Sequence, residues 1–139
     1  MAIDPGRLKH LEMIQQIIAR MAQNAFLLKG WSLTLVSAIL AIAVKDRLCA
    51  MVWIAFLPCI AFWALDGYFL RRERLFRRLW DVVRAQDETV PSDFSMDTRA
   101  VTDSVQSWLR ACFSRTLMIF HGTVFAVVAL LALGACPKT

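Results

Sequence analysis

The chain has 139 residues, of which 58% are hydrophobic, and a formal net charge of +5. This length and a mean hydropathy of +0.53 leave room for one membrane domain and exclude a large soluble enzyme. The cysteines form neither a C-x-x-C pair nor a metal-ligand spacing, so no disulfide framework and no metal centre is predicted. We therefore expect a single membrane domain over residues 1–139 that carries no cofactor.

The first predicted element is an amphipathic helix over residues 5–25. Asp4 and Pro5 form a typical helix start, because aspartate caps the first turn and proline at the first helical position leaves no N–H unpaired. Nothing interrupts the pattern before residue 44, so one helix about 60 Å long is predicted over residues 5–44. An apolar stripe follows this helix, and we expect later segments to cover it in part and neighbouring copies to complete the contact: Leu11, Ile14, Ile18 and Met21.

Three apolar stretches predict transmembrane helices, at residues 26–44, 48–70 and 117–135. Each is close to the roughly 20 residues that an α-helix needs to cross the hydrocarbon core of a bilayer. Pro58 should kink the second of these helices. The predicted fold is therefore all-α: a polytopic membrane helical bundle with about three transmembrane helices and amphipathic cytosolic helical extensions.

Lys29 and Asp66 are the only fully charged residues within these stretches. A tight turn at residues 45–47 would join the first two spans as an antiparallel hairpin and place both charges at the same depth. A charge there costs a few kcal/mol unless it is paired, hydrated or extended towards the surface. The pair is either a gate or ion-binding site, or a structural ion pair that fixes the register of the hairpin, and we favour the structural pair.

A ladder of small residues runs along the first predicted span. Small side chains four residues apart allow two helix backbones to approach closely in lipid, and serine or threonine can form hydrogen bonds across the contact. We therefore predict a helix–helix packing face at Gly30, Thr34, Ser37 and Ala41.

His121 lies inside the third predicted span, where it would contact a neighbouring helix or face a water-filled lumen and respond to pH. With Arg115 it forms R-x₅-H, which resembles the loose R-x₄₋₆-H pattern of HEPN-type ribonucleases, whose Arg and His activate a ribose 2′-hydroxyl. RNA does not reach a site within an apolar span, and the chain has no Gly-rich phosphate loop and no Ser-His-Asp order. We therefore predict that the protein is not an enzyme.

Residues 71–116 are predicted to be a cytosolic basic helical segment, with helices over 71–86 and 98–113 around a loop. Its arginines could bind anionic lipid headgroups, an anionic ligand or nucleic acid. We favour the headgroups, and we do not expect nucleic acid because the usual platform of interleaved aromatic residues is missing. The candidate residues are Arg71, Arg72, Arg74, Arg77 and Arg78.

The basic residues predict the orientation in the membrane. Residues 1–29 contain four of them and residues 71–116 contain nine, which leaves three of the 16 for the turn and the C-terminal tail. By the positive-inside rule, the N-terminus is cytoplasmic and the C-terminus periplasmic. The predicted location is the bacterial inner membrane.

Four segments together resemble a family of small uncharacterised bacterial inner-membrane proteins: HLEMIQQIIARM, FLLKGWS, FWALDGYFLRRERLFRRLW and SDFSMDT. That resemblance implies a location but no activity. The layout of a few spans with a small basic cytosolic part is also similar to membrane effectors of antiphage defence systems.

We expect a homo-oligomeric channel, pore or membrane-perturbing effector, because three spans are too few to enclose a water path. The resemblance to antiphage effectors implies that it could act in antiviral defence. The alternative is a non-conducting membrane anchor that recruits a cytosolic protein or an anionic ligand through residues 71–116.

Overall fold

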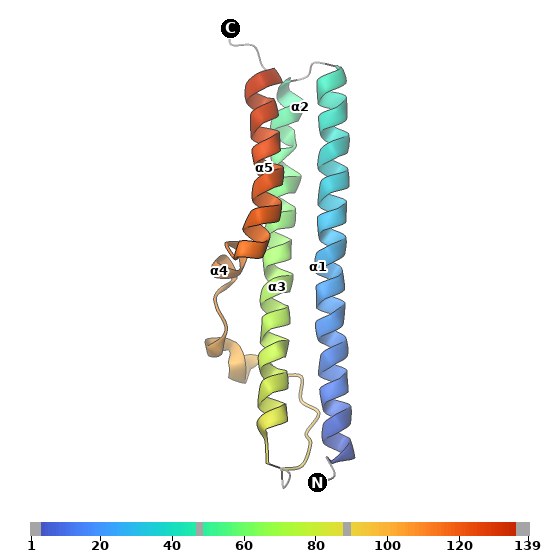
Figure 1. Cartoon of the computed structure of the whole chain (residues 1–139), viewed down its shortest axis with the longest axis vertical. Helices are drawn as coiled ribbons and strands as arrows, with labels where there is room; N and C mark the ends of the chain where they lie inside the picture. Colours follow the sequence, from blue (N-terminus) through green and yellow to red (C-terminus); the bar gives the residue numbers. More distant parts are fainter. Residues whose placement is uncertain (1–3, 47–48, 88–89, 136–139) are drawn as a thin grey trace.

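The structure, a computed structural model, describes residues 4–46, 49–87 and 90–135, and every regular element in these ranges is helical. Helix α1 (Pro5–Lys45) runs the whole length of an elongated bundle, antiparallel to α2 (Cys49–Ile54) and α3 (Phe56–Ala85), as Figure 1 shows. Helix α5 (Arg115–Ala135) packs against α2 and the adjoining half of α3. The short helices η1 (Arg99–Ser104) and α4 (Trp108–Cys112) lie along α3 (Figure 1).

Helix α1 confirms the single long helix predicted over residues 5–44. The side chain of Asp4 caps it by accepting a hydrogen bond from the backbone N–H of Arg7 at 3.1 Å, and Pro5 occupies the first turn. The helix ends at Lys45, where the N–H of Asp46 donates to the carbonyl of Ile42. At 1.5 Å per residue, α1 is about 60 Å long, roughly twice the thickness of the hydrocarbon core.

The interruption between α2 and α3 lies at Ala55, three residues before Pro58. Proline has no N–H, so the carbonyl of Ile54 loses its usual helical partner. The N–H of Ala55 is shared between the carbonyls of Met51 and Val52, each at 3.2 Å. The kink expected from Pro58 is therefore present as a local break in an otherwise continuous run from Cys49 to Ala85.

Helix α1, the α2–α3 run and helix α5 are each long and apolar enough to cross a membrane. Large apolar side chains project outward from all three, including Phe26 (76% exposed), Leu57 (68%) and Leu133 (77%). Apolar surface on this scale is typical of helices that contact lipid or other apolar helices. The coarse prediction of an all-helical chain with three candidate spans is confirmed.

Two apolar clusters hold the bundle together at different heights. The span cluster joins α1, the α2–α3 run and α5, and its buried members are Val36, Leu40, Ala43, Val52, Ala55, Cys59, Val128 and Ala132. The extension cluster joins the first half of α1 to the end of α3 and to η1, and its buried members are Ile14, Ile18, Leu75, Phe76, Leu79, Val83 and Val101. The candidate site lies between these clusters.

The helix predicted over residues 98–113 is wrong. The chain forms η1, extends at Val105 (φ −115°, ψ 138°) and then begins α4 at Trp108. A continuous helix would place Leu109 on the same face as Val101, but Leu109 is 61% exposed and Val101 is buried. The extended residues change the direction of the chain before α4, so that Cys112 contacts α3.

The loop before η1 is stabilised by its own side chains. The carboxylate of Asp93 accepts from the N–H of Ser95, and that of Asp97 accepts from the N–H of Arg99 at 2.9 Å. The hydrogen bond from the backbone of Arg99 is also the main reason that the pKa of Asp97 is lowered. Such local hydrogen bonds compete with helix formation, and they explain why part of the predicted helical segment 71–116 is not helical.

Candidate functional site: a buried charged triad

Asp66 is the centre of a charged triad buried among three helices. Its side chain is fully buried on α3, and one carboxylate oxygen, Oδ2, has two partners. The ammonium group of Lys29, on α1, lies 2.5 Å from this oxygen. Nε2 of His121, on α5, donates to the same oxygen at 2.9 Å. We call Lys29, Asp66 and His121 the triad.

The partners of Asp66 differ in their access to the surface. Lys29 is 23% exposed, and its ammonium group also contacts the carbonyl of Ala25 at 3.5 Å. His121 is buried, with its ring stacked on Trp63 at 6.0 Å between centroids and an angle of 8° between planes. Lys29 can therefore extend towards the nearby span boundary, whereas His121 is fixed in place.

Three buried side-chain oxygens have no hydrogen-bond partner among the described residues. They are Oδ1 of Asp66, the hydroxyl of Ser32, which is fully buried on α1 one turn after Lys29, and the hydroxyl of Ser114 just before α5. A buried polar atom without a partner costs free energy, and such atoms gather at functional sites. The triad therefore retains capacity to accept a proton or a hydrogen bond.

Helix α4 closes the triad region on one side of α3. The indole N–H of Trp63 donates to the carbonyl of Cys112 at 2.9 Å, and that of Trp108 donates to the carbonyl of Ala64 at 3.1 Å. Gly67 makes this approach possible, because a Cβ at this position would lie 2.2 Å from the sulfur of Cys112. Burial raises the pKa of the Cys112 thiol.

Arg115 and His121, whose spacing resembles the ribonuclease pattern, do not form a site on an accessible surface. His121 is buried against Asp66, while Arg115 is exposed at the start of α5. Nor do the described residues contain a group of three His, Cys, Asp or Glu side chains that could hold a metal ion. The chemistry that the triad offers is charge pairing and proton exchange within an apolar bundle.

The ladder of small residues is not the contact face between the helices of the protomer. Gly30, Thr34, Ser37 and Ala41 are all exposed, and a Cβ added at Gly30 would meet nothing within 4 Å. The contacts to α2, α3 and α5 use the opposite face of α1, about half a turn away. The buried residues on that opposite face are Ser32, Val36, Leu40 and Ala43.

The apolar stripe at the start of α1 is covered largely within the protomer. Ile14 is fully buried and Ile18 nearly so, while Leu11 and Met21 are half-buried. Helix α3 and Val101 of η1 provide the cover. The expected partial cover by later segments of the same chain is therefore present at Ile14 and Ile18, and completion of the contact by neighbouring copies at Leu11 and Met21 stays a prediction.

Three of the predicted anion-binding arginines already have partners nearby. Nε of Arg71 lies 3.4 Å from the carbonyl of Gln106, and Nη1 of Arg74 donates to the side-chain oxygen of the same residue at 3.3 Å. The guanidinium of Arg72 lies 5.9 Å from the centroid of the Phe76 ring. The two contacts to Gln106 tie the extended segment before α4 to α3, whereas the contact of Arg72 with Phe76 lies within α3.

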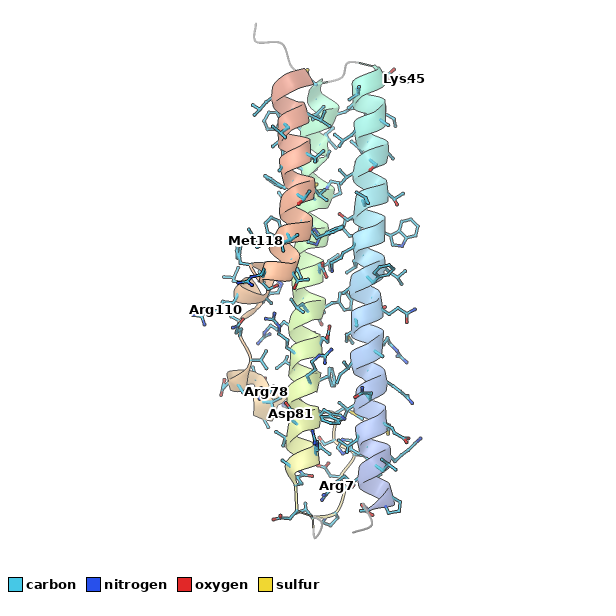
Figure 2. All side chains as sticks on the ribbon, viewed as in Figure 1. Arg7, Lys45, Arg78, Asp81, Arg110 and Met118 are labelled. Carbon is cyan, nitrogen blue, oxygen red and sulfur yellow. The ribbon has the colours of Figure 1, made fainter. Side chains whose placement is uncertain are left out.

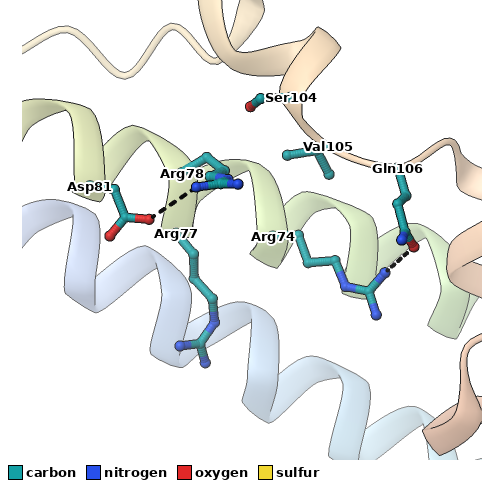
Figure 3. A pocket seen from close by; sticks show the side chains of 7 residues that line it. All are labelled: Arg74, Arg77, Arg78, Asp81, Ser104, Val105 and Gln106. Atoms are coloured by element: carbon teal, nitrogen blue, oxygen red, sulfur yellow. Dashed lines mark hydrogen bonds and ion pairs between the residues drawn. The ribbon is translucent and has the colours of Figure 1, made fainter.

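Arg77 and Arg78 are more exposed and pair with acidic residues of their own helix. Arg77 contacts Glu73 at 2.7 Å, and Arg78 lies 3.8 Å from Asp81. With Arg74 they line a cavity of about 350 Å³ between α3 and the segment after η1, which Figure 3 shows from close by.

Arg7 and His10 are a second pair of buried polar residues, and neither was predicted from the sequence to be functional. Arg7 donates to the carbonyls of Gln86, at 2.8 Å, and of Asp87. His10 donates to the carbonyl of Ser95 at 3.0 Å. Figure 2 shows Arg7 at the end of the bundle, where α1 meets the loop. Arg7 and His10 precede Ile14 by seven and four residues, so they lie on the same face of α1 as the buried stripe. This spacing could have predicted their burial.

Comparisons with protein-family models, curated proteins and solved structures find no match for this chain.

Proposed function

We propose that the chain is the protomer of a homo-oligomeric channel, pore or membrane-perturbing effector of the bacterial inner membrane. The triad carries this proposal. Ionisable residues inside membrane spans are rare and costly, and they mark ion or proton pathways by default. Asp66 is fully buried among three candidate spans and keeps one carboxylate oxygen without a partner among the described residues.

The proposal requires several copies, because three helices enclose no water path of their own. The outward-facing ladder of α1 supports an assembly. Small residues at Gly30, Thr34, Ser37 and Ala41 would let a second helix approach closely. None of these residues is needed for packing inside the protomer, so the face is available to a neighbouring copy.

The charge distribution supports an orientation with the extension cluster in the cytoplasm. Nine of the 16 basic residues lie in residues 71–116 and four in residues 1–29. By the positive-inside rule the N-terminus is then cytoplasmic and the C-terminus periplasmic. The antiviral role implied by the architectural resemblance stays a prediction.

The second candidate function is a non-conducting anchor that presents a cytosolic binding surface. The arginine-lined cavity beside α3 favours it, because charged donors are gathered there beyond the predicted apolar span at residues 48–70. In this function the triad would be a structural device that fixes the register of α1, α3 and α5.

Ion flux through liposomes distinguishes the two functions. Purified protein should dissipate a proton or potassium gradient, measured with trapped fluorescent dyes, and Asp66→Asn should reduce the flux to the protein-free background. Asp46→Asn is the matched control, since Asp46 is exposed at the far end of α1 and should conduct like the wild type. Wild-type flux no faster than the background would support the anchor instead.

A further inference from the structure

The charged side chains that line the cavity beside α3 are mainly positive. Arg74, Arg77 and Arg78 line it, and Asp81 is the one acidic residue among the described lining residues. Because Arg77 is also paired with Glu73 at 2.7 Å, an excess of one positive charge remains. The volume of about 350 Å³ lies at the lower end of the range for small-molecule sites. A compact anion therefore fits both the charge and the size.

The arginines keep donor capacity for such an anion. Each guanidinium has five N–H donors. The hydrogen bond from Arg74 to Gln106 is long at 3.3 Å, and the ion pair of Arg78 with Asp81 is loose at 3.8 Å. Figure 3 shows Arg74 next to Gln106 and Arg78 next to Asp81, with Arg77 directed towards α1. Forked donors of this kind match the oxygens of a phosphate group.

The distance of the cavity from the predicted span indicates whether its ligand is a soluble phosphate compound or a lipid headgroup. Arg77 and Arg78 follow the last residue of the predicted span, Leu70, by seven and eight residues, or about 10–12 Å along α3. The headgroup layer on each side of the hydrocarbon core is only about 5–8 Å thick. By the same count Arg71, Arg72 and Arg74 fall within that layer, whereas Arg77 and Arg78 lie beyond it, so the cavity extends out of the headgroup layer.

We infer that this cavity binds the phosphate group of a small soluble compound. None of the described lining residues is aromatic, so the cavity offers no stacking surface for a nucleobase. The inference depends on neither proposed function, because a ligand held here could act on a channel or on an anchor.

Calorimetry with inorganic pyrophosphate tests the inference on full-length protein in phosphatidylcholine nanodiscs. The wild type should bind one pyrophosphate per chain. Arg74→Gln with Arg78→Gln should weaken binding about tenfold or more, the loss expected when charge-assisted hydrogen bonds are removed. Arg20→Gln with Arg110→Gln removes the same charge from exposed sites elsewhere and should change affinity less than about twofold. No wild-type binding, or equal weakening in both variants, overturns the inference.

A variant with a gain of binding guards against misfolding as an explanation. Asp81→Asn removes the carboxylate that repels an anion, so affinity should rise about threefold, whereas Glu12→Gln on the exposed face of α1 should have no effect. An unchanged or weaker affinity in Asp81→Asn contradicts the inference.

A second set of nanodiscs, with equal parts phosphatidylcholine and phosphatidylglycerol, identifies the source of the phosphate. The tenfold difference between the two double-arginine variants should persist there. If phosphatidylglycerol abolishes pyrophosphate binding by the wild type, lipid headgroups occupy the cavity and the assignment to a soluble compound fails.

Discussion

Lys29→Met should lower the free energy of unfolding by about 3–5 kcal/mol, the usual cost of breaking a buried ion pair. The substitution leaves the carboxylate of Asp66 fully buried with His121 as its remaining partner in the triad. Asp66→Leu alone should cost less, because Lys29 is partly exposed and its ammonium group can extend to the span boundary. The double variant, Lys29→Met with Asp66→Leu, should recover much of the loss.

The measurement is unfolding in mixed detergent micelles, followed by circular dichroism. Lys9→Met is the matched control, since Lys9 forms an exposed pair with Glu12 at 3.2 Å and should cost less than about 1 kcal/mol. If neither Lys29→Met nor Asp66→Leu lowers the free energy of unfolding by more than the Lys9→Met control does, neither charge is buried in the folded protein. If the double variant folds but no longer conducts, the triad belongs to the conduction path.

Ile14→Ala should destabilise the extension cluster by about 2–5 kcal/mol, as for other fully buried aliphatic side chains. Ile14 is fully buried against α3, whereas its neighbour Met13 is 38% exposed. Met13→Ala should therefore cost less than about 1 kcal/mol. Hydrogen exchange in residues 10–20 and 75–85 reports on this cluster directly, and membrane insertion of the spans should be unaffected.

The same experiment separates cover within the protomer from cover by neighbouring copies. Contacts inside one chain do not depend on protein concentration, whereas contacts between copies follow mass action. We expect the exchange rates in wild type and Ile14→Ala to be independent of concentration. A loss of protection on dilution would show that other copies cover the stripe after all.

The long helices and the relative depth of Lys29 and Asp66 could be predicted because both depend on patterns along the chain. An apolar stretch of sufficient length, a capped start at Asp4 and Pro5, and a short turn between spans define an antiparallel hairpin without knowledge of its packing. Depth then follows from counting residues away from the turn. That count gives the equal depth of Lys29 and Asp66, whereas their contact also depends on how α1 and α3 are rotated.

The rotation of each helix about its axis could not be predicted. His121 joins Asp66 only because α5 turns that face towards α3, and an apolar helix with small residues all around carries little signal of orientation. The same lack of an orientation signal applies to the ladder of small residues on α1. Gly30 and Ala41 suggested a contact face, but Val36 and Ala43 form the one that the protomer uses.

The segment after α3 is divided into η1, an extended stretch at Val105 and α4, and this division depends on contacts that arise only in the folded chain. Val105 extends where a helix pattern was present, and the backbone of Gln106 then meets Arg71. Gly67 accepts the close approach of Cys112. Such contacts override local helix propensity, which is a weak determinant in short segments.

The number of copies in the membrane tests the proposed assembly most directly. Native mass spectrometry of wild-type protein released from lipid nanodiscs should give one closed oligomer of several copies. Gly30→Leu with Ala41→Leu should reduce that number without unfolding the protomer, because both positions lie on its exposed face and a Cβ at Gly30 meets nothing within 4 Å. Leu35→Met, also exposed on α1, should leave the oligomer intact. A wild-type protein that is monomeric in lipid would contradict the channel and leave the anchor as the function.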